Sequence, residues 1–321
     1  MNISVLGCGR WGSFIGWYLV NNGHNVIQWG TEGNYSFDVL KKTGRNEYVE
    51  LDKRIDLSSD LCYSLDKSDI IIISISAQSL RSFTKRIIDL GCDLSQKKFV
   101  LCMKGIEVDT GKRLSEVVNE CGIDINNIAI WVGPGHIQAF VKGKPNCMVI
   151  DSYNKELVKF LADNLRGNLI RFYYGDDIIG NEIGAAAKNV MGIAAGMLDG
   201  GGYATLKGPL MARGAREVAR LIKAMGGNEL SAYGLSHLGD YETTLFSEYS
   251  NNRNFGEKYV KGVKFQKLAE GVSTAKAMKL LGEKYNVDLP ITNAVYSIIY
   301  ENKEPMSVFL SLFSRSTRKE F

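Results

Sequence analysis

The sequence lacks long hydrophobic runs: no stretch of about 18 consecutive apolar residues occurs, so we expect no membrane insertion. The first residues also lack the basic and then apolar layout of a secretory signal. The six cysteines form no CxxC pair and no zinc spacing, a pattern typical of free thiols in a reducing compartment. We therefore expect a cytoplasmic protein.

An excess of one charge is also missing. The chain has 39 lysines and arginines against 35 aspartates and glutamates, and no block of basic residues stands out, so we expect no nucleic-acid partner. The three histidines, His24, His136 and His237, show neither HxH nor HxxxH spacing. We therefore expect no catalytic metal.

The first half of the chain alternates short apolar runs with helical patterns. Residues 3–6, 26–29 and 70–73 are predicted strands, and the last is a run of four isoleucines, typical of a parallel strand buried on both faces. Further strands are expected at 99–102, 128–131 and 148–150, with a helix at 114–121. This alternation predicts an α/β fold with a doubly wound sheet.

The second half shows only helical spacing. Helices are expected at 182–198, 209–225, 265–285 and 291–300, with Pro290 between the last two. We place the boundary near residues 175–177. The predicted organisation is a doubly wound domain over residues 1–175 followed by an all-α domain over residues 176–321.

A glycine motif lies between the first strand and a helix that opens near Trp11. Gly7 permits a tight turn, Gly9 lets the backbone approach a pyrophosphate, and Gly12 lets helix pack on strand. The start of the helix adds free N–H groups and the positive end of its dipole. The motif predicts a Rossmann-type dinucleotide site. The alternative is a plain glycine-rich turn.

The choice of dinucleotide depends on the segment about 20 residues beyond the motif. It contains the acid Glu32, and no lysine or arginine follows before Lys41. A carboxylate would repel a 2′-phosphate, which favours NAD and leaves NADP as the other option. The alternative is that Glu32 is an ordinary loop residue.

Lys188 lies among alanines and glycines in a predicted helix that is too small-sided for a simple surface element. A partly desolvated lysine has a lowered pKa and can accept a proton near neutral pH. The alternative is a lysine whose stem covers the edge of a core helix while its ammonium reaches water.

Seven segments, taken in order, resemble the NAD(P)-dependent glycerol-3-phosphate dehydrogenases, and together they span nearly the whole chain. They are residues 7–12, 104–107, 133–136, 187–189, 213–214, 239–240 and 255–256. The resemblance implies interconversion of glycerol 3-phosphate and dihydroxyacetone phosphate by hydride transfer. It also implies a small phosphorylated polyol as substrate and a possible homodimer.

The resemblance assigns roles to individual residues. Lys188 takes the position of the proton acceptor, and Lys104 that of a lysine touching both substrate and cofactor. Asp240 and Thr244 take that of the pair that orients this lysine and the substrate hydroxyl. The substrate-binding residues it implies are Lys104, Gly133, Asn189, Asp240, Ser250, Asn252 and Arg253. The cofactor-binding residues expected from the motifs and the resemblance are Gly7, Gly9, Arg10, Trp11, Gly12, Glu32, Lys104, Asn251 and Glu270.

The sequence departs from the family pattern at several positions. Asn251 stands where the family has an arginine that grips the substrate phosphate, and Arg253 is the candidate substitute. Gly135 replaces a polar residue, Gln138 and Ala139 replace an acidic pair, and residues 74–77 lack a proline. These departures leave open a dehydrogenase for another polyol phosphate or hydroxy acid.

A third hypothesis is a catalytically silent, NAD-binding regulatory protein. The joint presence of Lys104, Lys188 and Asp240 argues against it, because a dead site has no physical need for two lysines around an acid.

Overall fold

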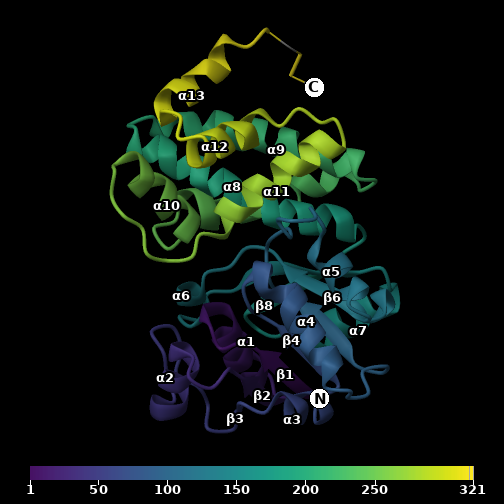
Figure 1. Ribbon diagram of the computed structural model, residues 1–321. Helices are drawn as coiled ribbons and strands as arrows, with labels where there is room; N and C mark the ends of the chain where they lie inside the picture. The colour runs from purple at the N-terminus through teal and green to yellow at the C-terminus, as the bar shows by residue number, and fades with distance from the viewer. Residues whose placement is uncertain (318, 321) are drawn as a thin grey trace.

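The computed structural model describes residues 1–317 and 319–320. Figure 1 shows that the first half of the chain forms a sheet flanked by helices, and that the second half forms a helical layer beyond one end of it. The strands form a single sheet in the order β3-β2-β1-β4-β5-β6-β7-β8. They are β1 (Asn2–Leu6), β2 (Asn25–Trp29), β3 (Asp56–Ser58), β4 (Ile70–Ile73), β5 (Lys98–Leu101), β6 (Ile128–Val132), β7 (Asn146–Ser152) and β8 (Ile170–Tyr174).

Strands β1 to β6 are parallel, and the pair β7 and β8 runs antiparallel to them. In β4, Ile70 and Ile72 pack into one core cluster and Ile71 and Ile73 into another, because successive side chains of a strand point to opposite faces. Helices therefore cover both faces, as the isoleucine run predicted. The doubly wound sheet is confirmed.

The helices of this half lie on the two faces. Side chains of α1, α2 and α7 pack into one cluster, and those of α3, α4 and α5 into the other. Their bounds are α1 (Arg10–Asn21), α2 (Tyr35–Thr43), α3 (Leu61–Asp66), α4 (Leu80–Asp89), α5 (Leu114–Glu120), α6 (Ile137–Phe140) and α7 (Lys155–Leu165), with η1 (Ala77–Ser79) and η2 (Ile125–Asn127) as single turns.

The helical half is built around α8, which is buried along almost its whole length. Its elements are α8 (Ile178–Gly200), α9 (Lys207–Ala224), α10 (Asn251–Val260), α11 (Glu270–Lys284), α12 (Pro290–Tyr300) and α13 (Pro305–Ser311), with the short turns η3 (Ala204–Leu206), η4 (Glu229–Tyr233), η5 (Leu238–Asp240) and η7 (Leu312–Ser314) and the π-helical turn η6 (Glu242–Phe246). The all-α second half is confirmed. None of the described helices is both long and apolar enough to cross a membrane.

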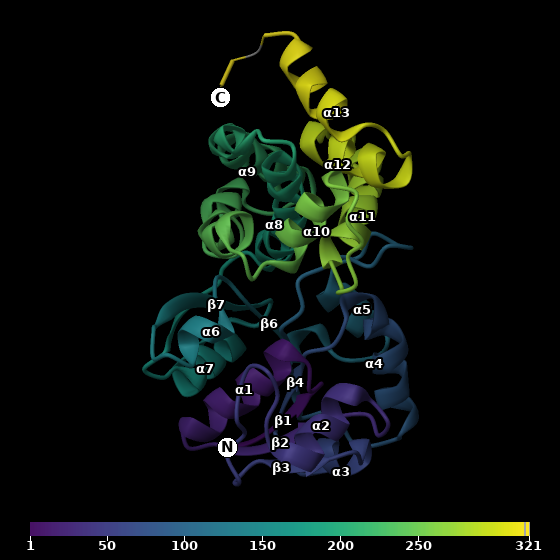
Figure 2. The ribbon, with the colours of Figure 1, turned by 90° about the vertical axis from the view of Figure 1, so that its left-hand side faces the viewer.

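Helices α8 and α10 lie side by side, as Figure 2 shows from a second direction. A Cβ atom at Gly196 would overlap the backbone of Arg253, and one at Gly256 would overlap the backbone of Ile193. Small residues on both helices therefore allow their backbones to touch. This contact fixes α10, and with it the loop that precedes α10, against the helix that carries Lys188.

Strands β3 and β8 and helix α10 were not among the elements expected from the sequence. Strand β3 has only three residues, and β8 is a largely exposed edge strand, so neither shows a buried apolar run. Helix α10 begins Asn251-Asn252-Arg253-Asn254, a run of low helix propensity that tertiary packing overrides. The helix expected from residue 265 begins only at Glu270, because Phe265 packs against Phe255 instead.

Candidate active site

A cleft of about 580 Å³ runs along the carboxyl edge of the parallel strands and faces the helical half. Gly7 follows β1 into it, Ser74 follows β4, Cys102 follows β5, and Lys188 of α8 forms its opposite wall. The volume lies within the range of small-molecule sites. Strand order reverses between β1 and β4, and doubly wound sheets bind their ligands at that point.

The glycine motif forms one end of the cleft. Gly7 has φ +115° and a Cβ there would overlap the carbonyl of Ser74, while a Cβ at Gly12 would overlap the carbonyl of Gly7. An added Cβ at Gly9, in contrast, meets nothing within 4 Å. Gly7 and Gly12 are thus required by the protein's own packing, and Gly9 leaves open space at the turn. This arrangement fits a dinucleotide pyrophosphate lying against the turn.

The start of α1 completes this end. Gly9 is its N-cap, no side chain caps it, and its first turn contains no acidic residue. Its free N–H groups and dipole therefore remain available to an anion. Arg10 and Trp11 both line the cleft, and Trp11 packs on Phe14 at 5.1 Å between ring centroids.

The expected selector of NAD lies at the outer rim. Thr31, Asn34 and Ser36 line the cleft, whereas the Glu32 side chain is 77% exposed and lies 4.0 Å from the ammonium of Lys41. Any effect of Glu32 on a bound ribose therefore acts across solvent in this conformation.

Asp240 joins the two lysines of the opposite end. Its Oδ2 atom lies 2.8 Å from Nζ of Lys188 and 2.7 Å from Nζ of Lys104, and the carboxylate is fully buried. Lys188 comes from α8, Asp240 from η5 and Lys104 from the loop after β5. Three segments far apart in sequence thus place two ammonium groups on one carboxylate.

Burial decides the charge of this cluster. It lowers the pKa of Lys188 to about 7, against the opposing effect of Asp240. Burial also disfavours the charged form of Asp240, but Lys104 and Lys188 outweigh it and the pKa of Asp240 is lowered. Near neutral pH the carboxylate is ionised, and Lys188 exists in both protonation states.

Thr244 fixes the direction of Lys188. The Lys188 Nζ atom donates to Oγ1 of Thr244 at 2.9 Å, and that hydroxyl donates to the carbonyl of Asp240 at 2.7 Å. A neutral amine has two N–H groups, and Asp240 and Thr244 accept both. The nitrogen lone pair is then left for the cleft that Lys188 lines. Thr244 lies on η6, a rare π-helical turn of the kind found at functional sites.

A chain of amides ties the two halves together behind this cluster. Asn189 donates to the carbonyl of Lys104 at 3.0 Å, Asn252 donates to Oδ1 of Asn189 at 3.0 Å, and Gly271 N donates to Oδ1 of Asn252 at 2.9 Å. Gly133 accepts from Nζ of Lys104 at 2.7 Å. Gly133 thus contacts the lysine rather than lining the cleft.

Comparison with known proteins places the chain in a family. Residues 2–158 match the NAD-dependent glycerol-3-phosphate dehydrogenase N-terminus, and residues 177–309 match the C-terminus of the same family. The chain belongs to this family. It is 34% identical to a glycerol-3-phosphate dehydrogenase (NAD(P)+) of Chlorobium phaeobacteroides strain BS1, over 100% of this chain and 99% of that protein.

Further members of the glycerol-3-phosphate dehydrogenase family match this chain over nearly their whole lengths. A Bacillus pumilus enzyme of the same name is 34% identical over 98% of this chain and 94% of its own. The crystal structure of the Coxiella burnetii glycerol-3-phosphate dehydrogenase has a TM-score of 0.90 at 26% identity, covering 98% of this chain and 99% of that one. The resemblance stated from the motifs is therefore confirmed.

The start of α10 is where this member of the dehydrogenase family departs from the expected pattern. Ser250, Asn251 and Asn252 all line the cleft, and Asn251 donates to the carbonyl of Leu268 at 3.1 Å. Arg253 points elsewhere: its guanidinium pairs with Asp199 at 2.7 Å and with Glu257 at 3.0 Å. Arg253 therefore does not supply a cation to the cleft in this conformation.

Glu270 reaches the cleft from the start of α11. Its Oε1 atom accepts from Ala77 N at 3.4 Å, and its Oε2 atom is buried without a partner among the described residues. Burial raises the pKa of this carboxyl. An acceptor left unpaired inside the cleft fits a bound amide or hydroxyl group.

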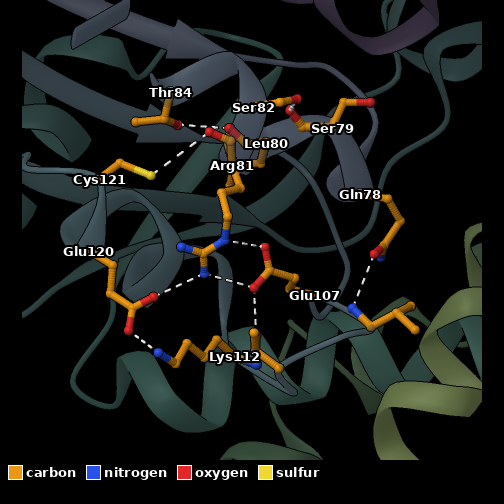
Figure 3. A network of polar contacts seen from close by, with 12 residues as sticks. Gln78, Ser79, Leu80, Arg81, Ser82, Thr84, Glu107, Lys112, Glu120 and Cys121 are labelled. Carbon is orange, nitrogen blue, oxygen red and sulfur yellow. Dashed lines mark hydrogen bonds and ion pairs between the residues drawn. The ribbon is translucent and has the colours of Figure 1, made fainter. Parts of the chain in front are cut away.

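An ion-pair network holds the Lys104 loop from behind. Arg81 of α4 extends between the carboxylates of Glu107, at 2.7 Å, and Glu120, at 2.9 Å (Figure 3). Gln78 donates to the carbonyl of Ile106 at 2.9 Å in the same network. These contacts anchor Ile106 and Glu107, and so hold the loop that carries Lys104. The sequence offered no signal for Arg81, because its partner is 26 residues away.

Thr243 and Tyr249 were not predicted as site residues from the sequence, whereas His136 follows a Gly-Pro-Gly turn that indicated either the wall of the site or a polar loop. Thr243 donates to Oδ1 of Asp240, and His136 and Tyr249 line the cleft with ring centroids 5.7 Å apart. The Nε2 atom of His136 is buried without a partner among the described residues, and burial together with nearby cations lowers its pKa to about 4.

Two of the cysteines lie close together in space although their spacing in the sequence did not indicate it. Cys62 of α3 and Cys92 after α4 bring their sulfur atoms within 3.1 Å, with Asp66 nearby. These residues lie outside the set that lines the cleft.

Proposed function

We propose that this protein interconverts glycerol 3-phosphate and dihydroxyacetone phosphate with a nicotinamide cofactor, and that Lys188 moves the hydroxyl proton. The observation that carries the proposal is the shared Asp240. It holds two lysines on one carboxylate while Thr244 directs the lone pair of Lys188 into the cleft. Membership of the dehydrogenase family supports the substrate pair.

In oxidation, neutral Lys188 takes the proton of the secondary alcohol, and in reduction its ammonium returns a proton to the ketone oxygen. The bound nicotinamide supplies the hydride chemistry, accepting a hydride in one direction and donating it in the other. Lys104 keeps one N–H beyond those bonded to Gly133 and Asp240, and this N–H can donate to the substrate oxygen. Asp240 balances the charge that Lys188 gains or loses.

We further propose that the chain divides as the sequence suggested, with the cofactor held by residues 1–175 and the catalytic lysine supplied by residues 176–321. The proposed cofactor contacts are Gly7, Gly9, Trp11, Gly12, Lys104, Asn251 and Glu270. The proposed substrate contacts are Lys104, Lys188, Asn189, Asp240, Ser250 and Asn252. NAD as the preferred cofactor, a cytoplasmic location and a homodimer belong to the same proposal. The six free cysteines support the location.

Two alternatives stay open to test. A dehydrogenase for another polyol phosphate or hydroxy acid would show a higher kcat/KM on that compound than on glycerol 3-phosphate. A silent NAD-binding protein would bind NADH without turnover. The lowered pKa of Lys188 argues for catalysis, since a purely structural lysine gains nothing from being half neutral at pH 7.

The deciding experiment compares wild type with Lys188→Ala, using NADH consumption with dihydroxyacetone phosphate and NADH binding by fluorescence. We expect turnover to fall by about 10²-fold or more while NADH affinity stays within a factor of about three. Lys276→Ala, an exposed lysine on α11, is the matched control and should leave both quantities unchanged. A near wild-type rate in Lys188→Ala would refute the proposed mechanism.

A further inference from the structure

Three cationic side chains line the cleft among the described residues, and their partners differ. Lys104 and Lys188 both contact Asp240, so one carboxylate already serves two lysines. Arg10 has no carboxylate partner in the part of the chain that the structure describes. Since an arginine keeps its charge at any pH of interest, Arg10 is the cleft's uncompensated permanent positive charge.

Arg10 also spans the two halves of the molecule. Its backbone is the first residue of α1, directly after the glycine turn, whereas its Nη1 atom donates to the carbonyl of Tyr249 at 3.2 Å. Tyr249 directly precedes Ser250, the N-cap of α10, on the opposite side of the cleft. A single neutral carbonyl leaves most of the five N–H donors of a guanidinium unused.

Among the described residues, no carboxylate lies within ion-pair distance of the Arg10 guanidinium. Its guanidinium carbon lies 5.6 Å from the ring centroid of Tyr48. His136 is neutral near pH 7, because burial lowers its pKa and the charge of Arg10 adds to that effect. Arg253 is held by Asp199 and Glu257, and Asn251 carries no charge. Among the described residues that line the cleft, Arg10 is therefore the cation without an ion-pair partner that a phosphoryl group entering near Ser250 would meet.

We propose that Arg10 binds the phosphoryl group of the three-carbon substrate, reaching it from the cofactor side of the cleft. The proposal rests on the proposed function for the identity of that substrate. A phosphoryl oxygen would replace the carbonyl of Tyr249 as acceptor and form a charge-assisted, two-pronged contact. The pyrophosphate of the dinucleotide offers the same chemistry from the other side of Arg10, so the test must separate the two sources.

The test compares wild type, Arg10→Met and Arg10→Lys in two measurements. Steady-state kinetics use dihydroxyacetone phosphate and its unphosphorylated analogue dihydroxyacetone, and calorimetry measures glycerol 3-phosphate binding to the NADH-saturated protein. In Arg10→Met we expect kcat/KM for dihydroxyacetone phosphate, and affinity for glycerol 3-phosphate, to fall by about 10- to 150-fold. The values for dihydroxyacetone and the dissociation constant of NADH should stay within about threefold. Arg10→Lys should lose less, because a point charge remains.

Two further variants sharpen the result. Arg45→Met removes an equal charge from an exposed loop outside the cleft and should change none of these values. Asn251→Arg, placed in the Arg10→Met background, restores a cation to the same cleft from the opposite wall and should recover at least part of the lost discrimination between the two ketones.

Two outcomes would overturn the proposal for Arg10. If Arg10→Met weakens NADH binding and lowers kcat/KM for both ketones by a similar factor, Arg10 serves the pyrophosphate. If glycerol 3-phosphate binds to Arg10→Met as tightly as to wild type, Arg10 contacts no substrate phosphate. Failure of the proposed function looks different: wild type itself would not turn over dihydroxyacetone phosphate, while the calorimetric comparison would still decide the role of Arg10.

Discussion

The Nζ atom of Lys188 lies 2.8 Å from Oδ2 of Asp240, in a site where the two side chains are only 10% and 1% exposed. An ion pair at this distance would normally hold a lysine fully charged. Burial penalises the ammonium more strongly than the single shared carboxylate stabilises it, so the pKa of Lys188 falls to about 7. The pair therefore combines a permanent acceptor, Asp240, with a group that exchanges a proton near neutral pH.

The first prediction concerns pH. Oxidation of glycerol 3-phosphate needs neutral Lys188, so its kcat/KM should rise with pH and level off above about 7, whereas kcat/KM for reduction needs the ammonium and should fall above that pH. Asp240→Asn removes the charge that favours the ammonium, so the inflection should move to lower pH. Profiles in both directions test this. An inflection that Asp240→Asn leaves in place would contradict it.

The second prediction separates two glycines of one motif. A Cβ at Gly12 overlaps the backbone of Gly7, so Gly12→Ala should lower the free energy of unfolding by about 1–3 kcal/mol. A Cβ at Gly9 meets no protein atom within 4 Å, so Gly9→Ala should fold normally and lose NADH affinity, by about tenfold. Thermal unfolding and NADH titration measure the two effects. Equal loss of stability in both variants would show that the Gly9 space is not reserved for a ligand.

The third prediction concerns a buried ion pair between the two halves. Arg113, before α5, donates to Glu182 of α8 at 2.6 Å, and Ser115 N donates to the same carboxylate at 2.9 Å. Arg113→Met leaves this carboxyl buried without its counter-charge and should cost about 3–5 kcal/mol in urea unfolding. The double variant Arg113→Met/Glu182→Gln removes both charges and should recover most of the loss. A double variant no more stable than Arg113→Met would mean that shape, rather than charge, dominates there.

The fourth prediction concerns cofactor choice. Among the described residues, no lysine or arginine lines the rim formed by Thr31, Asn34 and Ser36, so we expect a higher kcat/KM with NADH than with NADPH. Glu32 is 77% exposed, and solvent screens exposed charges, so Glu32→Gln should raise kcat/KM for NADPH by less than about tenfold. Lys41 lies beside Glu32 and carries the opposite charge. Lys41→Met is therefore the control, and its effect on kcat/KM for NADPH should have the opposite sign. A wild-type preference for NADPH would refute the expectation.

Most of the sheet could be predicted because local patterns determine it. The isoleucine run of β4, the strand before Gly7 and the helical spacing after Ile178 depend on residues close in sequence. Helix α10 could not be predicted, because its formation depends on close packing of Gly256 against α8 rather than on its own polar first turn. The short edge strands β3 and β8 gave no signal for a related reason: little of their surface is buried.

The glycine motif and Lys188 illustrate where sequence information ends. The sequence by itself determined that a tight turn precedes a helix, and that a lysine lies in an apolar helix, since both follow from neighbouring residues. Only the tertiary structure decided that Asp240 meets Lys104 across 136 positions and that Arg10 meets Tyr249 across 239. It also decided that Arg253 pairs with Asp199 instead of facing the cleft. Charges reach their partners through space, and which charge is left uncompensated depends on how the chain folds back on itself.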